Sequence, residues 1–316
     1  MSRKVVIIGA GAAGLTCAKQ LIKSGFKVSI FEKSRGLGGR MASRRIENGI
    51  FNHGASRIPN FRIYSNVPKG LKSILETAVK KNILIPQKNH LTSVGGMKTF
   101  TSYLSEGLEI EKNSEIIAVK RVDLEVELHL KNDSKIPIKD NFLVFAIPQP
   151  QVLQLLINDF TDIYNLVEPA KMYASISGLF GFDRAILLDH SFIENDCIFG
   201  FHENSRRGQN IKLDCWTIHS KKAYGIKFSH LNKDQIKERL FRDFEKLTSS
   251  NLPQPVYANG HRWLYGFTEK ALKKNHIYDK KFKIGICGDW CRGDTVLDAS
   301  ISGISLANEI LKSVVE

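Results

Sequence analysis

The chain has 316 residues, of which 42% are hydrophobic and 25% charged, a composition that excludes a largely disordered protein. This length favours two domains, or one large α/β domain with an inserted lobe, over a single simple core. The formal net charge of +14 is spread along the chain without the zinc-finger, helix-turn-helix or aromatic–basic patterns of nucleic-acid binders, so we expect a solvated basic surface or an electropositive mouth for a phosphate-bearing ligand.

The first forty residues predict a strand, a turn, a helix and a second strand. Residues 5–8 are β-branched, which is typical of a parallel strand buried on both faces. A glycine-rich turn at 9–14 leads into residues 15–24, whose apolar side chains have helical spacing, and residues 27–31 form a strand that ends in Glu32. A glycine motif in this context, followed by an acid after the second strand, is typical of dinucleotide-binding proteins.

The turn glycines have separate roles in such a site. Gly9 permits the tight turn, Gly11 lets the backbone approach a pyrophosphate, and Gly14 lets the helix pack on the strand. The phosphates are expected at the helix N-terminus, where unpaired N–H groups and the helix dipole favour negative charge. Glu32 lies 18 positions beyond Gly14, near the spacing at which such an acid accepts the ribose hydroxyls. A glycine-rich turn that binds nothing is the alternative.

Further along the chain, strands and helices alternate. We expect helices at 71–81, 97–105, 151–156, 234–247 and 299–312, and strands at 115–122, 124–130, 135–138, 142–147, 175–182, 213–219 and 284–287. Asp294 or Thr295 is placed to cap the last helix. The predicted fold class is α/β, with a Rossmann-like nucleotide-binding domain (a parallel sheet with helices) and an inserted α+β substrate lobe. We assign residues 1–60, 90–150 and 280–316 to the first domain, and residues 61–89 and 151–279 to the lobe.

Two further clusters decide which dinucleotide is expected. One is Gly36-Leu37-Gly38-Gly39-Arg40-Met41 with Phe51-Asn52-His53-Gly54-Ala55 downstream, and the other is Gly285-Ile286-Cys287-Gly288-Asp289-Trp290. Together they resemble the FAD proteins of the amine oxidase and carotene desaturase superfamily. The acid that this superfamily has before Gly-Ala is replaced here by Asn52 or His53.

The resemblance implies a non-covalently bound FAD. Arg40 would face its phosphates and flavin, Gly54 and Ala55 would pass beside the isoalloxazine, and Asp289 would bind the ribityl chain or a phosphate. The closing helix would direct its N-terminus at the flavin, where its dipole stabilises the negative charge of the reduced ring. The complete set of expected FAD contacts is Gly9, Gly11, Ala12, Ala13, Gly14, Glu32, Lys33, Gly39, Arg40, Met41, Gly54, Ala55, Ser56, Arg57, Ile116, Gly288, Asp289, Ala299 and Ile301.

Several shorter segments are more specific. They are Gly-Arg-Met at 39–41, Val-Gly-Gly-Met at 94–97, Phe-Ala-Ile-Pro-Gln-Pro at 145–150, Leu-Pro-Gln-Pro at 252–255, His-Arg-Trp-Leu-Tyr at 261–265 and Gly-Asp-Trp-Cys at 288–291. Over nearly the whole chain they resemble the renalase family, especially its prokaryotic branch, although the usual Gln-Tyr pair after Gly-Ala is Ser56-Arg57 here. The resemblance implies an oxidase that transfers hydride from 2- or 6-dihydro isomers of NAD(P)H to flavin N5, regenerates NAD(P)+ and reduces oxygen to hydrogen peroxide. Aromatisation drives that hydride transfer, so the protein mainly positions the ring and needs no general base.

The candidates for the substrate side of the site are His219, Trp263, Trp290 and Asn204. By the resemblance, His219 aligns with a histidine beside the renalase flavin; a histidine satisfied at a strand end is the alternative. Trp263 and Trp290 are candidates for the pocket wall, with core packing as the rival interpretation. Asn204, followed by Arg206-Arg207, is a candidate for the polar or phosphate end of the substrate, and an exposed loop is the alternative.

Other functions stay open on the sequence. An oxidase or dehydrogenase of an amine or an apolar polyene shares the same motifs, and a flavoprotein redox sensor without turnover is the option outside enzymes. No apolar run reaches the roughly 18 residues of a membrane span, and the five cysteines are scattered, unlike a disulfide framework or a zinc site. We expect a cytoplasmic protein with a nicotinamide substrate and oxygen as partners, and no metal, nucleic acid or membrane. The oligomeric state is left open.

Overall fold

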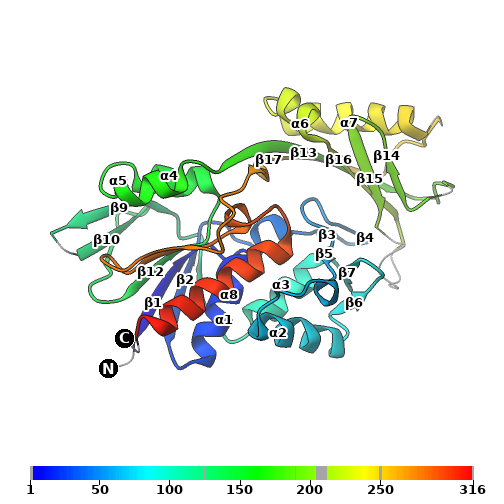
Figure 1. Cartoon of the computed structure of the whole chain (residues 1–316). Helices are drawn as coiled ribbons and strands as arrows, with labels where there is room; N and C mark the ends of the chain where they lie inside the picture. The colour runs from blue at the N-terminus through cyan, green and yellow to red at the C-terminus, as the bar shows by residue number, and fades with distance from the viewer. Residues whose placement is uncertain (1–2, 124, 189, 204–211, 249–250, 315–316) are drawn as a thin grey trace.

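The computed structural model describes residues 3–123, 125–188, 190–203, 212–248 and 251–314. The described residues contain two larger sheets. A six-stranded sheet lies near both termini, and a five-stranded sheet lies in the lobe at the upper right of Figure 1. Two long paired strands, β13 (Lys171–Phe182) and β17 (Tyr257–Lys270), run between the two regions (Figure 1). The lobe is therefore tied to the rest of the molecule by continuous backbone hydrogen bonding.

The six-stranded sheet has the order β18-β19-β12-β1-β2-β8, and all its neighbouring pairs are parallel except β18 with β19. Its strands are β1 (Lys4–Ile8), β2 (Lys27–Glu32), β8 (Glu109–Lys112), β12 (Phe142–Phe145), β18 (Ile277–Asp279) and β19 (Ile284–Ile286). Strands buried on both faces pair in this way because helices cover the sheet. The predicted α/β class, with a parallel Rossmann-like sheet, is confirmed.

Two helices, α1 (Ala12–Lys23) and α8 (Val296–Lys312), lie side by side (Figure 1). Gly303 allows their close approach, because a Cβ there would lie 2.2 Å from the carbonyl oxygen of Ala13. Further along both helices, Gln20 Nε2 donates to Asn308 Oδ1 at 3.0 Å, so the helices run in the same direction. Since α1 follows β1 and α8 follows β19 by way of η4 (Asp289–Cys291), both N-termini lie at the carboxyl edge of the parallel sheet.

Smaller elements surround this sheet. The strands are β3 (Arg44–Ile46), β4 (Gly49–Phe51), β5 (Ile58–Pro59), β6 (Leu84–Pro86), β7 (His90–Ser93), β9 (Ile116–Val122), β10 (Glu125–Leu130) and β11 (Lys135–Pro137). The helices are η1 (Gly39–Met41), η2 (Phe61–Ile63), α2 (Lys69–Lys80), α3 (Met97–Ser105), α4 (Gln149–Leu156) and α5 (Thr161–Val167). Leu71 and Leu75 of α2 share one hydrophobic core with Leu15 of α1 and Ile304 of α8. This part of segment 61–89, which we assigned to the lobe, thus packs on the nucleotide-binding domain, and the lobe boundaries stay a prediction.

The lobe sheet is antiparallel, with the order β14-β15-β16-β13-β17. Its other elements are β14 (Phe192–Glu194), β15 (Ile198–His202), β16 (Asp214–Ser220), α6 (Lys222–Phe228) and α7 (Lys233–Thr248). One face packs on α7 through a core that includes Phe180, Trp216 and Phe244. Because side chains alternate along a strand, the opposite face carries Leu179 and Cys215, which pack on Phe51 of β4. The lobe therefore turns this second face toward the nucleotide-binding domain.

The closing helix begins at Val296, earlier than the predicted start at residue 299. Thr295, one of the two predicted caps, accepts a hydrogen bond from the Asp298 N–H, and the Asp298 side chain accepts one from the Thr295 N–H. This reciprocal capping box supplies the start signal. In the part of the chain that the structure describes, no helix has both the length and the apolar character required to cross a membrane.

Candidate active site

In the turn between β1 and α1, two glycines leave no room for a side chain, whereas a third glycine has open space beside it. Gly9 has a φ of +103°, and a Cβ there would lie 2.6 Å from the carbonyl oxygen of Ala146. A Cβ on Gly14 would lie 2.1 Å from the carbonyl oxygen of Gly9, whereas a Cβ on Gly11 would meet no atom within 4 Å. Gly11 also leaves α1 without a side-chain cap. The turn thus offers open space and backbone donors suited to a phosphate.

Glu32 fixes this turn from the end of β2. Its side chain is buried, and its Oε2 accepts the Ala10 N–H at 2.9 Å while its Oε1 accepts the Ser34 N–H at 2.8 Å. The adjoining Ser114 N–H donates to the Glu32 carbonyl oxygen at 3.0 Å, which brings Ile116 at the start of β9 to the same corner. Each carboxylate oxygen has further acceptor capacity; its use by a ribose stays a prediction.

We expect Glu32→Gln to weaken FAD binding by roughly ten- to 100-fold. The amide would turn a donor toward the N–H of either Ala10 or Ser34, and charge-assisted hydrogen bonds worth roughly 1.5–3 kcal/mol would be lost. Fluorescence titration of the flavin-free protein with FAD measures the affinity. Arg35→Gln, at an exposed neighbouring position, is the control and should bind FAD as the wild type does. If Glu32→Gln binds FAD as tightly as the wild type does, Glu32 does not contact the cofactor.

Arg40 and Asp289, which come from two separate sequence clusters, bind each other. Arg40 Nη1 and Nη2 donate to Asp289 Oδ2 and Oδ1 at 2.7 and 2.6 Å, which makes the ion pair bidentate. The Asp289 side chain is 5% exposed and that of Arg40 is 27% exposed, and the Thr268 hydroxyl donates to the same carboxylate at 3.3 Å. The pair therefore joins η1 to the loop before α8 and leaves part of the guanidinium accessible.

The segment 52–55 passes directly beside Arg40. The Ala55 N–H donates to the Arg40 carbonyl oxygen at 2.8 Å, and a Cβ on Gly54 would lie 2.1 Å from that oxygen and 3.3 Å from Trp263 Cζ2. The Gly38 N–H in turn donates to the Ala10 carbonyl oxygen at 2.8 Å. The glycine turn, the Gly-Gly-Arg segment and the Gly-Ala pair, far apart in the sequence, are adjacent in the fold.

The strand register of the lobe places several polar and aromatic side chains in one row. His219 of β16 is directly opposite Phe199 of β15 and Ser177 of β13. Ser177 is in turn opposite His261 of β17. Directly paired residues share a sheet face, and this is the face turned toward the nucleotide-binding domain. Trp263, two residues beyond His261, continues the row toward Gly54.

His53 lies against this row. Its carbonyl oxygen accepts Trp263 Nε1 at 2.8 Å and the Ser177 hydroxyl at 3.0 Å. Its ring stacks on the Trp263 indole, with centroids 5.5 Å apart and planes 16° apart, and meets the His261 ring edge-on at 4.6 Å. Within the described residues, the buried His53 Nδ1 makes no hydrogen bond of normal geometry. We call His53, His261 and Trp263 the aromatic wall.

The aromatic wall is uncharged at neutral pH. The pKa of His53 is lowered to about 3, mainly by burial and also by the neighbouring His261 and Arg44. Burial also lowers the pKa of His261 to about 4, with Lys233 and Arg44 as additional causes. Protonation of either imidazole ring is therefore disfavoured.

We expect the free energy of unfolding to fall as the pH drops from about 6.5 toward 4. The unfolded chain protonates its histidines near pH 6.5, whereas the folded pKa values of His53 and His261 are about 3 and 4, so the unfolded state binds more protons in this window. The loss should approach about 1.4 kcal/mol per pH unit for each histidine. Denaturant unfolding at several pH values measures the slope, which His53→Gln should reduce. Leu75→Ala, a core control, should lower stability at every pH without changing the slope, and equal slopes for His53→Gln and wild type would contradict the shifted pKa.

The remaining predicted residues take different positions. Trp290 is fully buried in the core of the nucleotide-binding domain, where its Nε1 donates to the Ile147 carbonyl oxygen at 3.1 Å, so its side chain presents no surface to a ligand. Arg57 is exposed, with its guanidinium 5.2 Å from the centroid of the Phe201 ring. Asn204 lies outside the described residues. Buried predicted contacts are Ala12, Ala13, Met41, Ser56, Ile116, Gly288, Ala299 and Ile301, while Lys33 and Gly39 are exposed.

Sequence reasoning did not assign His53, His261 or Ser177 to the substrate side, and it missed Glu203. Glu203 is fully buried, and its Oε1 accepts the Asn52 N–H and the Thr217 hydroxyl, each at 2.7 Å. A carboxylate from the lobe thus supports the segment in which Asn52 or His53 stands where the sequence resemblance would expect an acid. His53 and His261 do stand in motifs noted in the sequence, but their contact depends on the register of β17, for which there is no local signal.

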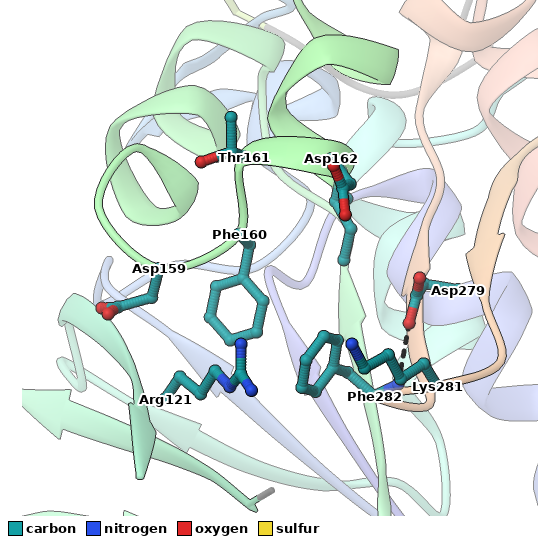
Figure 2. A pocket seen from close by; sticks show the side chains of 9 residues that line it. Arg121, Asp159, Phe160, Thr161, Asp162, Asp279, Lys281 and Phe282 are labelled. Carbon is teal, nitrogen blue, oxygen red and sulfur yellow. Dashed lines mark hydrogen bonds between the residues drawn. The ribbon is translucent and has the colours of Figure 1, made fainter. Parts of the chain in front are cut away.

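A separate cavity of about 190 Å³ lies near the start of β19 (Figure 2). It is lined by Arg121, Asp159, Phe160, Thr161, Asp162, Ile163, Asp279, Lys281 and Phe282. Phe282 lies just before β19, whereas the glycine turn follows β1. Because these strands are parallel, the cavity lies at their amino ends and the turn at their carboxyl ends. Figure 2 shows charged side chains of both signs around the two phenylalanine rings. The cavity therefore lies outside the candidate active site.

The sequence matches to known proteins cover only a part of this chain. Residues 7–73 match the family model of an NAD(P)-binding Rossmann-like domain. An L-amino-acid oxidase of Mus musculus is 45% identical over 60 residues, which are 18% of this chain and 10% of that protein. A 4,4'-diapophytoene desaturase (4,4'-diaponeurosporene-forming) of Staphylococcus aureus strain Newman is 34% identical over 64 residues, which are 20% of this chain and 13% of that protein. The match therefore spans only a small part of these relatives.

Similarity to solved structures extends over the whole chain, as one example shows. This example is a protein of Exiguobacterium sp. 255-15, provisionally named a protoporphyrinogen oxidase, which aligns over 100% of both chains with a TM-score of 0.74 and 14% identity. At that identity, the likeness shows the fold alone. The sheet order, the glycine turn and the family match agree on a Rossmann-like nucleotide-binding fold, and the relatives that match in sequence are named as an oxidase and a desaturase.

Proposed function

We propose that this chain is an FAD-dependent oxidase that takes hydride from the 2- or 6-dihydro isomers of NAD(P)H, regenerates NAD(P)+ and reduces oxygen to hydrogen peroxide. The observation that carries the proposal is the position of segment 52–55, which contacts Arg40 on one side and the aromatic wall on the other. A planar cofactor ring and a planar substrate ring suit this junction. The choice of a dihydronicotinamide as the substrate rests on the resemblance of the shorter sequence segments to renalases.

The residues of the nucleotide-binding domain fit an extended dinucleotide cofactor. The open space at Gly11 and the uncapped start of α1 suit a pyrophosphate, and the carboxylate of Glu32 suits ribose hydroxyls. Gly54 keeps the backbone close to Arg40 because no side chain fits there. FAD, bound without a covalent link, would supply the ring that accepts the hydride and passes electrons to oxygen.

The aromatic wall would bind and orient the nicotinamide ring. Trp263 is partly exposed and stacks on the buried His53, so it could offer an aromatic surface to the ring. The neutral His53 and His261 place no positive charge beside a ring that becomes positive as hydride leaves. The row of Phe199, His219, Ser177 and His261 would offer an aromatic face and polar groups for positioning that ring. The basic surface, with the exposed Arg57 near Phe201, favours a phosphorylated substrate.

Anaerobic mixing with 2- or 6-dihydro-NAD(P) is the experiment that tests the proposal. We expect the yellow protein to lose its flavin absorbance rapidly and to recover it with hydrogen peroxide formation when oxygen is admitted. The ordinary 4-dihydro isomer should react slowly and is the matched control substrate. Stopped-flow absorbance measures the reduction, and a peroxide assay measures the product.

Other substrates separate the alternatives. A monoamine or an apolar polyene that reduces the flavin as fast as the dihydro isomers would overturn the proposal in favour of an amine oxidase or a desaturase. A flavin that no substrate reduces would favour a redox sensor without turnover. If the purified protein is colourless and cannot be loaded with FAD, FAD is not its cofactor.

A further inference from the structure

Ser177 connects two residues of the candidate active site. Its Oγ lies 3.0 Å from the carbonyl oxygen of His53 and 3.0 Å from Nδ1 of His219. Ser177 is 0% exposed and His219 is 4% exposed. The direction of the Ser177 hydroxyl proton is therefore set by its two protein partners and not by solvent. A serine hydroxyl carries one proton and accepts through its lone pairs.

The chemistry of the two partners determines the direction of both hydrogen bonds. A carbonyl oxygen only accepts, so Ser177 donates its proton to His53. The hydroxyl must then accept from His219, and Nδ1 of His219 carries the ring hydrogen. If Ser177 donated to His219 instead, two oxygen lone pairs would face each other at 3.0 Å in a buried site, which is costly.

The surroundings hold both ends of this chain of hydrogen bonds. Trp263 Nε1 donates to the same carbonyl oxygen of His53 at 2.8 Å and so fixes its orientation. The His219 ring stacks on Phe199, with centroids 5.1 Å apart and planes 21° apart, and Phe201 meets it edge-on at 6.1 Å. The stacked ring is thus held with Nδ1 toward Ser177.

We propose that Ser177 is a positioning residue that holds His219 as the Nδ1–H tautomer, so that the other ring nitrogen, Nε2, acts as a hydrogen-bond acceptor. Free imidazole side chains favour the opposite tautomer, so the hydroxyl reverses the ordinary preference. For catalysis the inference rests on the proposed function. A dihydronicotinamide has a carboxamide N–H group for an acceptor to bind, and a neutral acceptor does not oppose the positive charge that develops on its ring.

The tautomer is tested by two-dimensional ¹H–¹⁵N NMR of histidine-labelled protein at neutral pH, with the His219 signals assigned from a His219→Gln spectrum. We expect Nδ1 to be protonated and Nε2 bare in the wild type, and the equilibrium to move toward Nε2–H in Ser177→Ala. Ser177→Thr keeps the hydroxyl and should restore the wild-type pattern. Ser175→Ala removes a buried hydroxyl two residues away on the same face and should leave the pattern unchanged.

Either of two spectra overturns the tautomer assignment: a wild-type protein with Nε2–H, or an unchanged pattern in Ser177→Ala. The wild-type and Ser177→Thr spectra keep the test decisive if Ser177→Ala does not fold by circular dichroism. A wild-type spectrum with bare Nε2, retained in Ser177→Thr, supports the assignment, and Nε2–H in either contradicts it.

Anaerobic flavin reduction tests the consequence for catalysis. Ser177→Ala should slow reduction by 2- or 6-dihydro-NAD(P) by about three- to tenfold, the effect of one hydrogen bond, with FAD content unchanged, while Ser177→Thr and Ser175→Ala react as the wild type. Equal rates for Ser177→Ala and wild type would overturn the positioning role. If no dihydronicotinamide reduces the wild-type flavin, the proposed function fails, and the NMR spectra still decide the tautomer.

Discussion

In the flavin-free protein, Gly11→Ala should change the free energy of unfolding by no more than about 0.5 kcal/mol, yet it should lower the affinity for FAD by at least about tenfold. Residue 11 has a φ of −83°, which alanine adopts freely, and its Cβ would meet no protein atom within 4 Å. That same space is where the pyrophosphate is expected, so the methyl group would exclude the cofactor without disturbing the fold.

Gly14→Ala is the matched variant with the opposite expectation for the fold. Its Cβ would lie 2.1 Å from the Gly9 carbonyl oxygen, so α1 would have to move away from β1. The flavin-free protein should lose about 1–3 kcal/mol of stability or more. Denaturant unfolding of both flavin-free variants, followed by FAD titration, makes the comparison. Wild-type FAD affinity in Gly11→Ala would contradict the position of the pyrophosphate, and wild-type stability in Gly14→Ala would contradict the helix–strand packing.

Asp289→Ala should destabilise the protein by about 3 kcal/mol, because it leaves the Arg40 guanidinium in a largely buried position without its bidentate partner. The 27% exposure of the Arg40 side chain keeps this loss at the low end of the range for a broken buried pair. FAD should also be released more readily, since η1 and the loop before α8 would no longer be joined. Denaturant unfolding and the FAD content after gel filtration measure the two effects.

The control is a double-mutant cycle with Arg40→Met and Asp289→Leu. Removing both partners should cost less than the sum of the single changes, because no buried charge is left alone. If the losses from the two single variants simply add, the ion pair does not hold the two segments together, and the predicted effect of Asp289→Ala on FAD retention loses its basis.

The aromatic wall shows why the substrate side was harder to predict than the nucleotide side. Trp263 and Trp290 each stand next to a charged residue, Arg262 and Asp289, and both were candidates for the pocket wall. One is fully buried behind the glycine turn, and the other stacks on His53. Whether an aromatic residue packs in a core or lines a site depends on which other segments cover it, and these segments are more than 100 residues away in both cases.

The sequence alone determined the strand–turn–helix–strand unit, the acid at Glu32 and the closing helix, with Thr295 as one of two candidate caps. These features depend on periodicity, glycine conformations and side-chain capping, which are visible in short stretches of sequence. Only the tertiary structure decided that Arg40 pairs with Asp289, that Glu203 supports Asn52, and that Ser177 links His53 to His219. Those contacts follow from the register of long antiparallel strands and the docking of the lobe, where the free energy comes from packing between distant segments and leaves no local pattern to recognise.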